Sequence, residues 1–422
     1  MRNGLENGNG YNKYYEVNIR MIEFIDKKIV SPILAISKGT VGDVAYYFAF
    51  TAVFMFRFYY TSMFPTILEK PLFLAFPYYA GLLLLIAFSC LNVIDAFFHS
   101  RKEAVFLICI LMAAALNVVT LKKFDYFLPF FLLILASRGR NIRPVFILYI
   151  VIGSAFLLTA YYASMNGYIP YLVYDRGNAG MLSHAFGMNY RTTLAGYVMC
   201  IIMCYAIVRA ERIHLWEYMM LWFDNWLVWR YTQSRTACFC MAIFLVAHGV
   251  VIVYYRIRGE WIKIPKWSAL VHILCAVSSF VAVGLWAKIG DSNISIPEGG
   301  DSLVSRLSLS VEAFKTYPIN LFGNAVRERS AGGLVDTSEP YFYLDILYVR
   351  VLFIGGIALF ILYLALMTIA SLKAAKMQQV ILALALFIIG VDSIVESHFL
   401  TLSFNVLILY SLGYLSSDKQ IT

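Results

Sequence analysis

Residues 291–356 read DSNISIPEGGDSLVSRLSLSVEAFKTYPINLFGNAVRERSAGGLVDTSEPYFYLDILYVRVLFIGG and form the longest polar interval in an otherwise apolar chain. Charged residues are spread along this stretch: Arg306, Lys315, Arg327, Arg329, Asp336, Glu339, Asp345 and Arg350, the last already inside the next apolar run. Membrane helices can associate through apolar surface alone, so guanidiniums and carboxylates beside a bilayer need another role. Because arginine binds anionic oxygens through two parallel hydrogen bonds, we interpret this stretch as a loop that binds an anionic substrate.

The composition places the chain among polytopic membrane proteins. Of its 422 residues, 61% are hydrophobic and only 14% are charged, which is typical of that class. The net charge of +9 follows the predicted membrane topology, so it does not indicate a nucleic-acid-binding surface. All seven cysteines fall in apolar runs. We therefore expect no disulfide framework.

The apolar runs predict an all-α integral membrane protein with about twelve transmembrane helices. Their approximate bounds are 43–64, 72–93, 104–120, 124–136, 144–165, 192–208, 215–229, 236–255, 268–289, 342–371, 380–395 and 400–415. Residues 1–40 are predicted to form a cytoplasmic segment with an amphipathic helix, residues 41–415 the membrane domain, and residues 416–422 a cytoplasmic tail. Two loops outside the membrane are long, at about 166–191 and 290–342.

The distribution of basic residues predicts the orientation, because lysine and arginine accumulate in cytoplasmic loops. With the N-terminus inside, the predicted inner loops carry Arg101, Lys102, Arg138, Arg140, Arg143, Arg209, Arg212, Arg256, Arg258, Lys263, Lys266, Lys373 and Lys376. The short outer turns carry only Lys70, Lys122 and Lys123. We therefore expect both long loops to face the outside.

Several arginines do not follow this rule. They lie on the predicted outer side: Arg176, Arg191, Arg230, Arg235, Arg306, Arg327, Arg329 and Arg350. An unpaired arginine near the membrane costs a few kcal/mol, so this concentration favours a functional role. For Arg235, in the turn Ser234-Arg235-Thr236 between two short apolar segments, an interfacial arginine that reaches toward lipid headgroups is an equally good reading. Glu396, in the turn Glu396-Ser397-His398, is read either as a base or as a helix-end carboxylate that pairs with a nearby arginine.

These motifs resemble the bacterial O-antigen and capsule polymerase/ligase superfamily. Ser234-Arg235-Thr236 is similar to the serine–arginine turn of that superfamily. Arg306, followed by Ala313, Pro318 and Leu321-Phe322-Gly323, is similar to its large-loop pattern. A third set of residues resembles the superfamily's segment that ends the large loop and enters the next helix: Asp336-Thr337-Ser338, Tyr343-Leu344, Leu347 and Gly355-Gly356. The resemblance covers roughly residues 165–410. The ligase branch is expected to carry a histidine just before the final loop segment, where this chain has Asp336, Ser338 and Glu339, so the resemblance favours the Wzy-type polymerases.

The resemblance implies a GT-C-like membrane glycosyltransferase in the bacterial cytoplasmic membrane, with its site facing outside. Its donor and acceptor would be undecaprenyl-diphosphate-linked oligosaccharides, and its partners membrane lipids, a chain-length regulator and a flippase. Fixed cations would stabilise the leaving diphosphate, and a carboxylate would accept the proton of the acceptor hydroxyl. The predicted catalytic residues are Arg235, Arg306, Asp336, Glu339 and Glu396. The predicted substrate-binding residues are Arg176, Arg191, Arg327, Arg329, Arg350 and His398. No cofactor and no metal ion are expected.

Two other functions remain open at this point. A ligase would transfer the same kind of donor to a different acceptor. A flippase for lipid-linked oligosaccharides would also have about twelve helices and interior arginines. It has no evident need for a long outer loop rich in acids and arginines, and the sequence lacks the internal repeat that builds many transporters.

Overall fold

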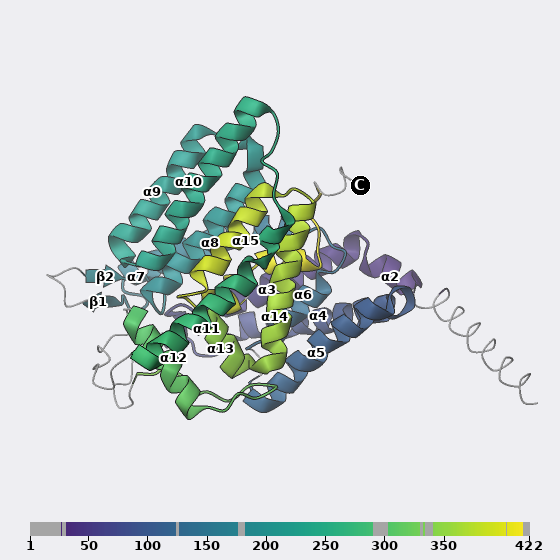
Figure 1. Cartoon of the computed structure of the whole chain (residues 1–422), viewed down its shortest axis with the longest axis horizontal. Helices are drawn as coiled ribbons and strands as arrows, with labels where there is room; N and C mark the ends of the chain where they lie inside the picture. Colours follow the sequence, from purple (N-terminus) through teal and green to yellow (C-terminus); the bar gives the residue numbers. More distant parts are fainter. Residues whose placement is uncertain are drawn as a thin grey trace, which may run out of the picture.

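The computed structural model describes residues 27, 31–123, 126–175, 182–289, 303–329, 332–333, 341–401 and 403–416. Over these residues the protein is an all-α bundle with one small hairpin (Figure 1). The α-helices are α2 (Ser31–Ser37), α3 (Thr40–Tyr60), α4 (Leu72–His99), α5 (Arg101–Leu121), α6 (Leu128–Ala136), α7 (Arg143–Met165), α8 (Arg191–Arg209), α9 (Leu215–Thr232), α10 (Arg235–Arg258), α11 (Val271–Ile289), α12 (Leu303–Thr316), α13 (Leu347–Arg350), α14 (Gly356–Lys376) and α15 (Val380–Asp392). The antiparallel hairpin pairs β1 (Val173–Asp175) with β2 (Leu182–His184).

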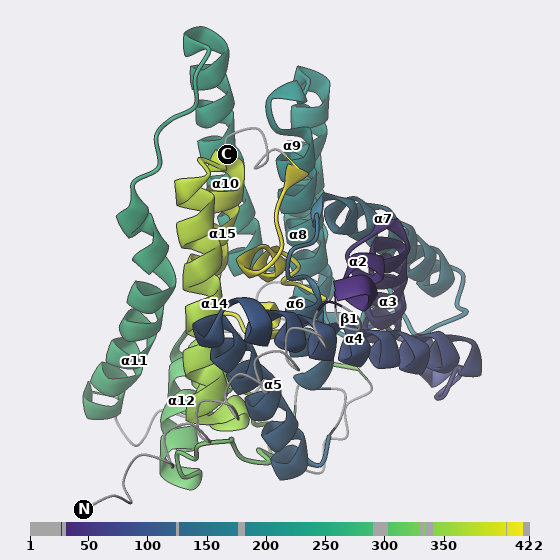
Figure 2. The same cartoon turned by 90° about the vertical axis from the view of Figure 1, so that its right-hand side faces the viewer.

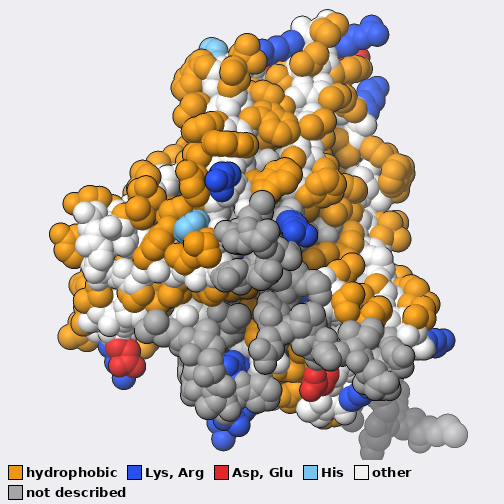
Figure 3. All heavy atoms as spheres, turned by 90° about the vertical axis from the view of Figure 1, so that its left-hand side faces the viewer, with side chains coloured by type: hydrophobic (Ala, Val, Ile, Leu, Met, Phe, Trp, Pro, Cys, Tyr) orange, Lys and Arg blue, Asp and Glu red, His pale blue; other side chains and the backbone are white. Residues whose placement is uncertain are grey.

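Eight segments among the described residues are long and apolar enough to cross a membrane. They are Thr40–Tyr60, Leu72–His99, Arg101–Leu121, Arg143–Met165, Arg191–Arg212, Arg235–Arg258, Lys266–Ile289 and Leu347–Lys376. Apolar side chains also cover much of the described surface, and the fewer Lys and Arg side chains are scattered, several of them at the top and bottom of the view (Figure 3). Large exposed side chains such as Leu72, Phe76 and Ile257 are stable in contact with lipid but not with water. The chain is therefore a multi-pass membrane protein.

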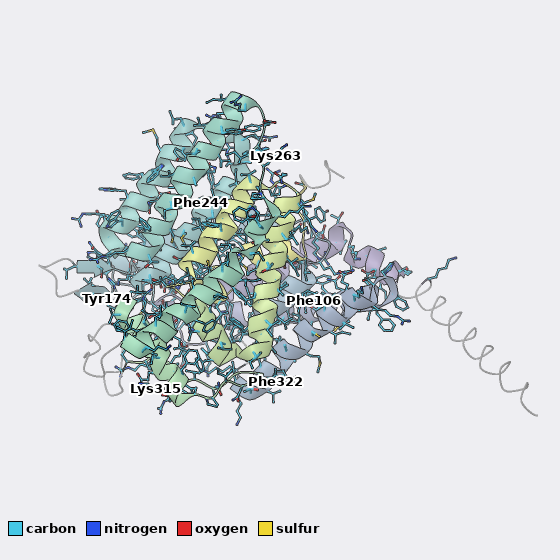
Figure 4. The ribbon with its side chains drawn as sticks, in the orientation of Figure 1. Phe106, Tyr174, Phe244, Lys263, Lys315 and Phe322 are labelled. Carbon is cyan, nitrogen blue, oxygen red and sulfur yellow. The ribbon has the colours of Figure 1, made fainter. Side chains whose placement is uncertain are left out.

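The basic loops gather at one end of the bundle, called the basic end below. Arg143 Nη2 donates to Val208 O at 3.2 Å, Arg256 donates to Ile213 O, and Gln378 Nε2 donates to Ile264 O at 3.3 Å. At the same end, Arg140 Nη1 pairs with Asp43 at 2.6 Å. Lys263 marks this end, while Lys315 and Phe322 lie at the opposite end, called the loop end (Figure 4). The predicted topology requires the basic loops to lie on one side of the membrane, and these contacts place them at one end of the bundle.

The predicted span 342–371 is not one straight helix. Its first part consists of α13 and a π-helical turn, η5 (Val351–Gly355), and Gly356 then breaks the path with φ 80° and ψ 174°. The first amides of α14 are free of helical partners, and Ile357 N and Ala358 N donate instead to Asn320 O and Leu321 O. A Cβ on Gly356 would lie 2.2 Å from Gly323 N. The chain therefore turns a corner at this glycine, at the loop end, before α14 crosses toward the basic end.

The predicted span 400–415 is wrong. The described residues of this stretch contain only short 3-10 segments, with η6 (His398–Leu400) before η7 (Leu407–Ser411). This irregular backbone is buried inside the bundle: Tyr149 Oη donates to Ser403 O at 2.6 Å, and Asn405 Nδ2 donates to Phe399 O at 3.0 Å. Non-helical backbone is tolerated at membrane depth only where protein surrounds and satisfies it.

Two of the predicted spans, 124–136 and 380–395, form helices that are too short to cross the bilayer, α6 and α15. At 1.5 Å per residue, the nine residues of α6 span about 14 Å and the 13 residues of α15 about 20 Å, against a hydrocarbon layer about 30 Å thick. Both start or end at the basic end, so their other ends lie inside the bundle. Leu347 N, at the start of α13, donates to Ser393 O just past the end of α15, at 3.2 Å. α14 and α15 pack against each other, and Figure 2 shows them between α11 on one side and α8 on the other.

The two long loops meet at the loop end. Met63 N donates to Gly187 O at 2.8 Å and Asn189 N to Thr61 O at 3.0 Å, which fixes the first loop over α3. Gly333, from the second loop, donates its amide to Asn189 O at 2.6 Å. The expected amphipathic helix of the N-terminal segment lies mostly outside the described residues. The part that is described, α2, packs against α3 and α4 at the basic end.

Candidate functional site

A buried ion pair joins the second loop to the turn after α15. Arg306 Nη1 lies 2.9 Å from Glu396 Oε1 and also donates to Val395 O at 2.7 Å. The side chains of Arg306 and Glu396 are only 7% and 5% exposed. This is the structural centre of the site, because it connects two residues that lie 90 positions apart in the sequence.

The sequence of α12 explains why Arg306 points inward. Its buried residues are Ser305, Arg306, Leu309, Ser310 and Ala313, which share one face of a helix because they recur at intervals of three and four. Among them, Ser310 Oγ donates to Arg306 O at 2.8 Å. Arg306 therefore occupies a core-facing position of an amphipathic helix, where an unpaired guanidinium would be costly.

Glu396 is positioned by the end of α15. Glu396 N donates to Asp392 O at 2.9 Å and Ser393 N donates to Ile389 O at 3.0 Å, so helical hydrogen bonding continues beyond the last residue of α15. Because α15 spans about 20 Å of a layer about 30 Å thick, the carboxylate lies below the loop-end surface.

Asp345 completes the set around Arg306. Its Oδ2 lies 3.9 Å from Arg306 Nε, and its side chain is 13% exposed. Burial raises the pKa of Asp345 to about 7, although the positive charge of Arg306 opposes the shift. One guanidinium thus faces two carboxylates, of which Glu396 is in direct contact.

A second buried pair lies beside the first. Arg350 Nη2 donates to Glu328 Oε2 at 2.6 Å, and its Nη1 donates to Ser397 Oγ at 2.8 Å and to Tyr343 Oη. The guanidinium also lies over the Tyr343 ring, 4.3 Å from its centroid. Because Ser397 adjoins Glu396, this arginine connects the end of the second loop to the same turn.

His398 lies within the site as well. Its Nε2 is 3.5 Å from Glu396 Oε2, so the two oxygens of Glu396 face different partners, Arg306 and His398. Burial lowers the pKa of His398, and the negative charge of Glu396 only partly opposes the shift. The imidazole is therefore neutral at pH 7.

Asp392 is the most deeply buried carboxyl of the site. It is 1% exposed. Cys240 of α10 and Glu396 lie close to it. A carboxylate in such surroundings is too costly to keep charged, so Asp392 holds a proton.

The site holds more carboxyls than guanidiniums. Its described members include the arginines Arg306 and Arg350 and the carboxyls Glu328, Asp345, Asp392 and Glu396. Glu396 and Glu328 take up the two guanidiniums, which leaves Asp345 and Asp392 as the groups that retain protons. The arrangement is suited to accepting and holding a proton beside a fixed positive charge.

The other residues predicted from the sequence are placed differently. Arg235 is the exposed first residue of α10, five positions before Cys240 and so about 7 Å further toward the loop end. No ion pair joins it to the buried cluster among the described residues. Arg191 is buried, donates to Ser183 Oγ at 3.2 Å and lies over the Tyr190 ring.

Arg327 is exposed, and Arg329 is half-buried, with its amide donating to Phe342 O at 2.7 Å. Arg176, Asp336 and Glu339 lie outside the described residues.

The structure thus brings together four of the predicted residues: Arg306, Arg350, Glu396 and His398. It adds three carboxyls that were not predicted as site residues: Glu328, Asp345 and Asp392. Asp392 could have been found as a carboxyl at the end of a strongly apolar run, where a charge is expensive. Nothing local in the sequence indicates that Glu328 pairs with Arg350.

The described residues contain no group of three or more His, Cys, Asp or Glu side chains that could hold a metal ion.

Comparison with known proteins finds no match to the chain among protein-family models, characterised proteins or solved structures.

Proposed function

We propose that this chain is a membrane glycosyltransferase that polymerises lipid-linked oligosaccharide repeat units at the loop end of the bundle. One observation carries the proposal: Glu396 lies between Arg306, from the long polar loop, and His398, from its own turn, below the loop-end surface. A carboxylate in that position is oriented by one partner and has a neutral imidazole beside its other oxygen. This is the arrangement that deprotonation of an acceptor hydroxyl needs.

The proposed step transfers a glycan from a lipid diphosphate to a sugar hydroxyl. The hydroxyl oxygen of the acceptor attacks the anomeric carbon of the donor, and the bond from that carbon to the diphosphate oxygen breaks. The electron pair leaves with the diphosphate, and the hydroxyl proton passes to Glu396. His398, 3.5 Å away, takes the proton onward.

Arg306 is assigned to holding the base. Because its charge is balanced by Glu396 in direct contact, Arg306 is less suited to binding the diphosphate than the sequence suggested. Two other arginines fit that role better: Arg235 is exposed, and Arg329 Nη1 has no hydrogen-bond partner among the described residues. Fixed guanidiniums stabilise the charge that develops on a leaving diphosphate.

A ligase is the second candidate. The resemblance implies that ligases use a histidine base, and His398 reaches Glu396 although it comes from a different segment of the chain. The polymerase and ligase reactions differ only in the acceptor, so an assay with each acceptor distinguishes them.

Purified protein in liposomes, given an undecaprenyl-diphosphate-linked repeat unit, tests the proposal. A polymerase produces a ladder of longer lipid-linked glycans and releases one undecaprenyl diphosphate for each bond formed. A ligase extends nothing until a different acceptor is added. Movement of the intact lipid-linked unit between leaflets, without new glycosidic bonds, would identify a flippase and contradict the proposal.

A further inference from the structure

A cavity of about 470 Å³ lies at the basic end, far from the site described above. It lies between the end of α8, the turn that joins α14 to α15, and the start of α7. Gln378, on its wall, hydrogen-bonds to the backbone of Ile264, next to Lys263, which marks this end of the bundle in Figure 4. The volume falls within the roughly 300–1,000 Å³ of cavities that bind small molecules.

Three arginines line this cavity: Arg143, Arg209 and Arg212. Arg209 is neutralised by Glu217 at 2.9 Å, and Arg212 Nε lies 3.9 Å from Glu211, which also lines the cavity. Arg143 differs from both, because its guanidinium contacts the neutral Val208 O, and no carboxylate pairs with it among the described residues. The lining therefore carries a surplus positive charge that is centred on Arg143.

Much of the remaining wall is apolar and aromatic. Tyr255 and Trp261 stack with ring centroids 4.3 Å apart, and Ile207, Val380 and Leu415 add aliphatic surface. Tryptophan and tyrosine concentrate at the boundary between lipid and water. A cavity that joins cationic and apolar lining at that depth suits a ligand that is itself anionic at one end and apolar at the other.

We propose that this cavity binds the phosphodiester headgroup of an anionic phospholipid from the leaflet at the basic end. Arg143 and Arg212 contact the phosphate, and the start of the acyl chains lies along Trp261 and Leu415. Basic pockets between membrane helices recognise anionic lipids by this chemistry. The bound lipid would connect α7, α8 and α15. The proposal is independent of the glycosyltransferase function.

Native mass spectrometry of the purified full-length protein, titrated with phosphatidylglycerol, tests this proposal. The variants are Arg143→Gln and Arg212→Gln. The side chain of Arg212 is 77% exposed, so its loss leaves the fold intact even if the Arg143 variant folds poorly. Lys263→Gln removes the same charge at the same end but outside the cavity lining, and it is the matched control. The Arg143 variant is expected to weaken binding about tenfold or more, since hydrogen bonds to charged groups contribute about 1.5–3 kcal/mol.

The expected result is saturable binding of phosphatidylglycerol that both arginine variants weaken and the lysine variant preserves. Equal weakening by Lys263→Gln would mean that the overall charge of this end attracts the lipid, and would overturn the proposal. Binding of phosphatidylcholine as strong as that of phosphatidylglycerol would overturn it as well. If inorganic phosphate displaces the lipid at similar concentrations, the ligand is a free phosphate compound and the lipid assignment fails.

Discussion

Arg306 Nη1 and Glu396 Oε1 lie 2.9 Å apart in the interior of the bundle, where an amphipathic helix of the polar loop meets the turn after a helix too short to cross the bilayer. Neither residue is stable there without the other, because a buried charge that loses its partner costs about 3–5 kcal/mol. The loop and the membrane domain are therefore joined through the residues that are proposed to carry the chemistry.

Replacing Arg306 is expected to impair both folding and activity. Arg306→Gln leaves Glu396 without its cation and should lower the free energy of unfolding by about 3–5 kcal/mol. Arg306→Lys keeps the charge but cannot contact Glu396, Asp345 and Val395 O with separate donors, so we expect folded protein with about a hundredfold slower glycan elongation. Elongation rates at matched protein level are the measurement. Lys315→Gln, on the exposed face of the same helix, is the control, and normal rates for the lysine variant would contradict the assigned role.

Gly356 is expected to tolerate no side chain. Gly356→Ala forces a residue with a Cβ into a backbone conformation that only glycine adopts readily, which costs about 1–3 kcal/mol. The added carbon would also lie 2.2 Å from Gly323 N. We expect a lower melting temperature and little activity. Gly284→Ala, in α11, places its Cβ in open space and should be neutral or slightly stabilising. Equal melting temperatures for the two variants would show that the corner before α14 is not fixed by Gly356.

The stability of the protein should depend on the protonation of Asp345. Its pKa is raised to about 7 in the folded protein by burial, against about 3.9 in an unfolded chain. The folded state therefore binds the proton more tightly, and this contribution to stability is lost as the pH rises from about 4 through 7. Asp345→Asn stays neutral, so it should unfold at a higher temperature than the native protein at pH 8, and this gain should shrink as the pH falls and vanish at about pH 4. A constant difference between the two proteins across this range would contradict the shift.

Labelling of single cysteines tests the orientation of the bundle. Lys263 and Lys315 lie at opposite ends (Figure 4). In a background without the exposed Cys90 and Cys109, Lys315→Cys should react with an impermeant maleimide in intact cells. Lys263→Cys should react only after the membrane is opened. Reaction of the 263 position alone would reverse the proposed orientation, and reaction of both in intact cells would contradict the placement of the two ends on opposite sides of the membrane.

The long apolar runs predicted most of the membrane helices, because helix length and hydropathy are local properties of the sequence. The run at 400–415 has the same apolar character but forms irregular backbone. The difference lies in its surroundings, because side chains such as Tyr149 and Asn405 donate hydrogen bonds to backbone carbonyls inside the protein. Hydropathy alone cannot separate a lipid-facing helix from a buried irregular segment.

The site was predictable only in part, for a related reason. Arg306 and Glu396 were recognisable as charges beside apolar runs, which are expensive unless they have a function or a partner. Their contact with each other, and that of Arg350 with Glu328, depend on how α12 and α13 pack against the end of α15. Such pairings across many positions are set by tertiary packing and leave no local pattern.

The most direct test of the account is the rate of glycosidic bond formation by the Glu396→Gln variant in liposomes. The measurement is single-turnover release of undecaprenyl diphosphate from a lipid-linked repeat unit, with Glu312→Gln, on the exposed face of α12, as the control. The Glu396 variant is expected to bind the donor but to form bonds at least about a hundredfold more slowly, while the control matches the native protein. Bond formation at the native rate by the Glu396 variant would contradict the role of Glu396 as the base, and with it the proposed mechanism.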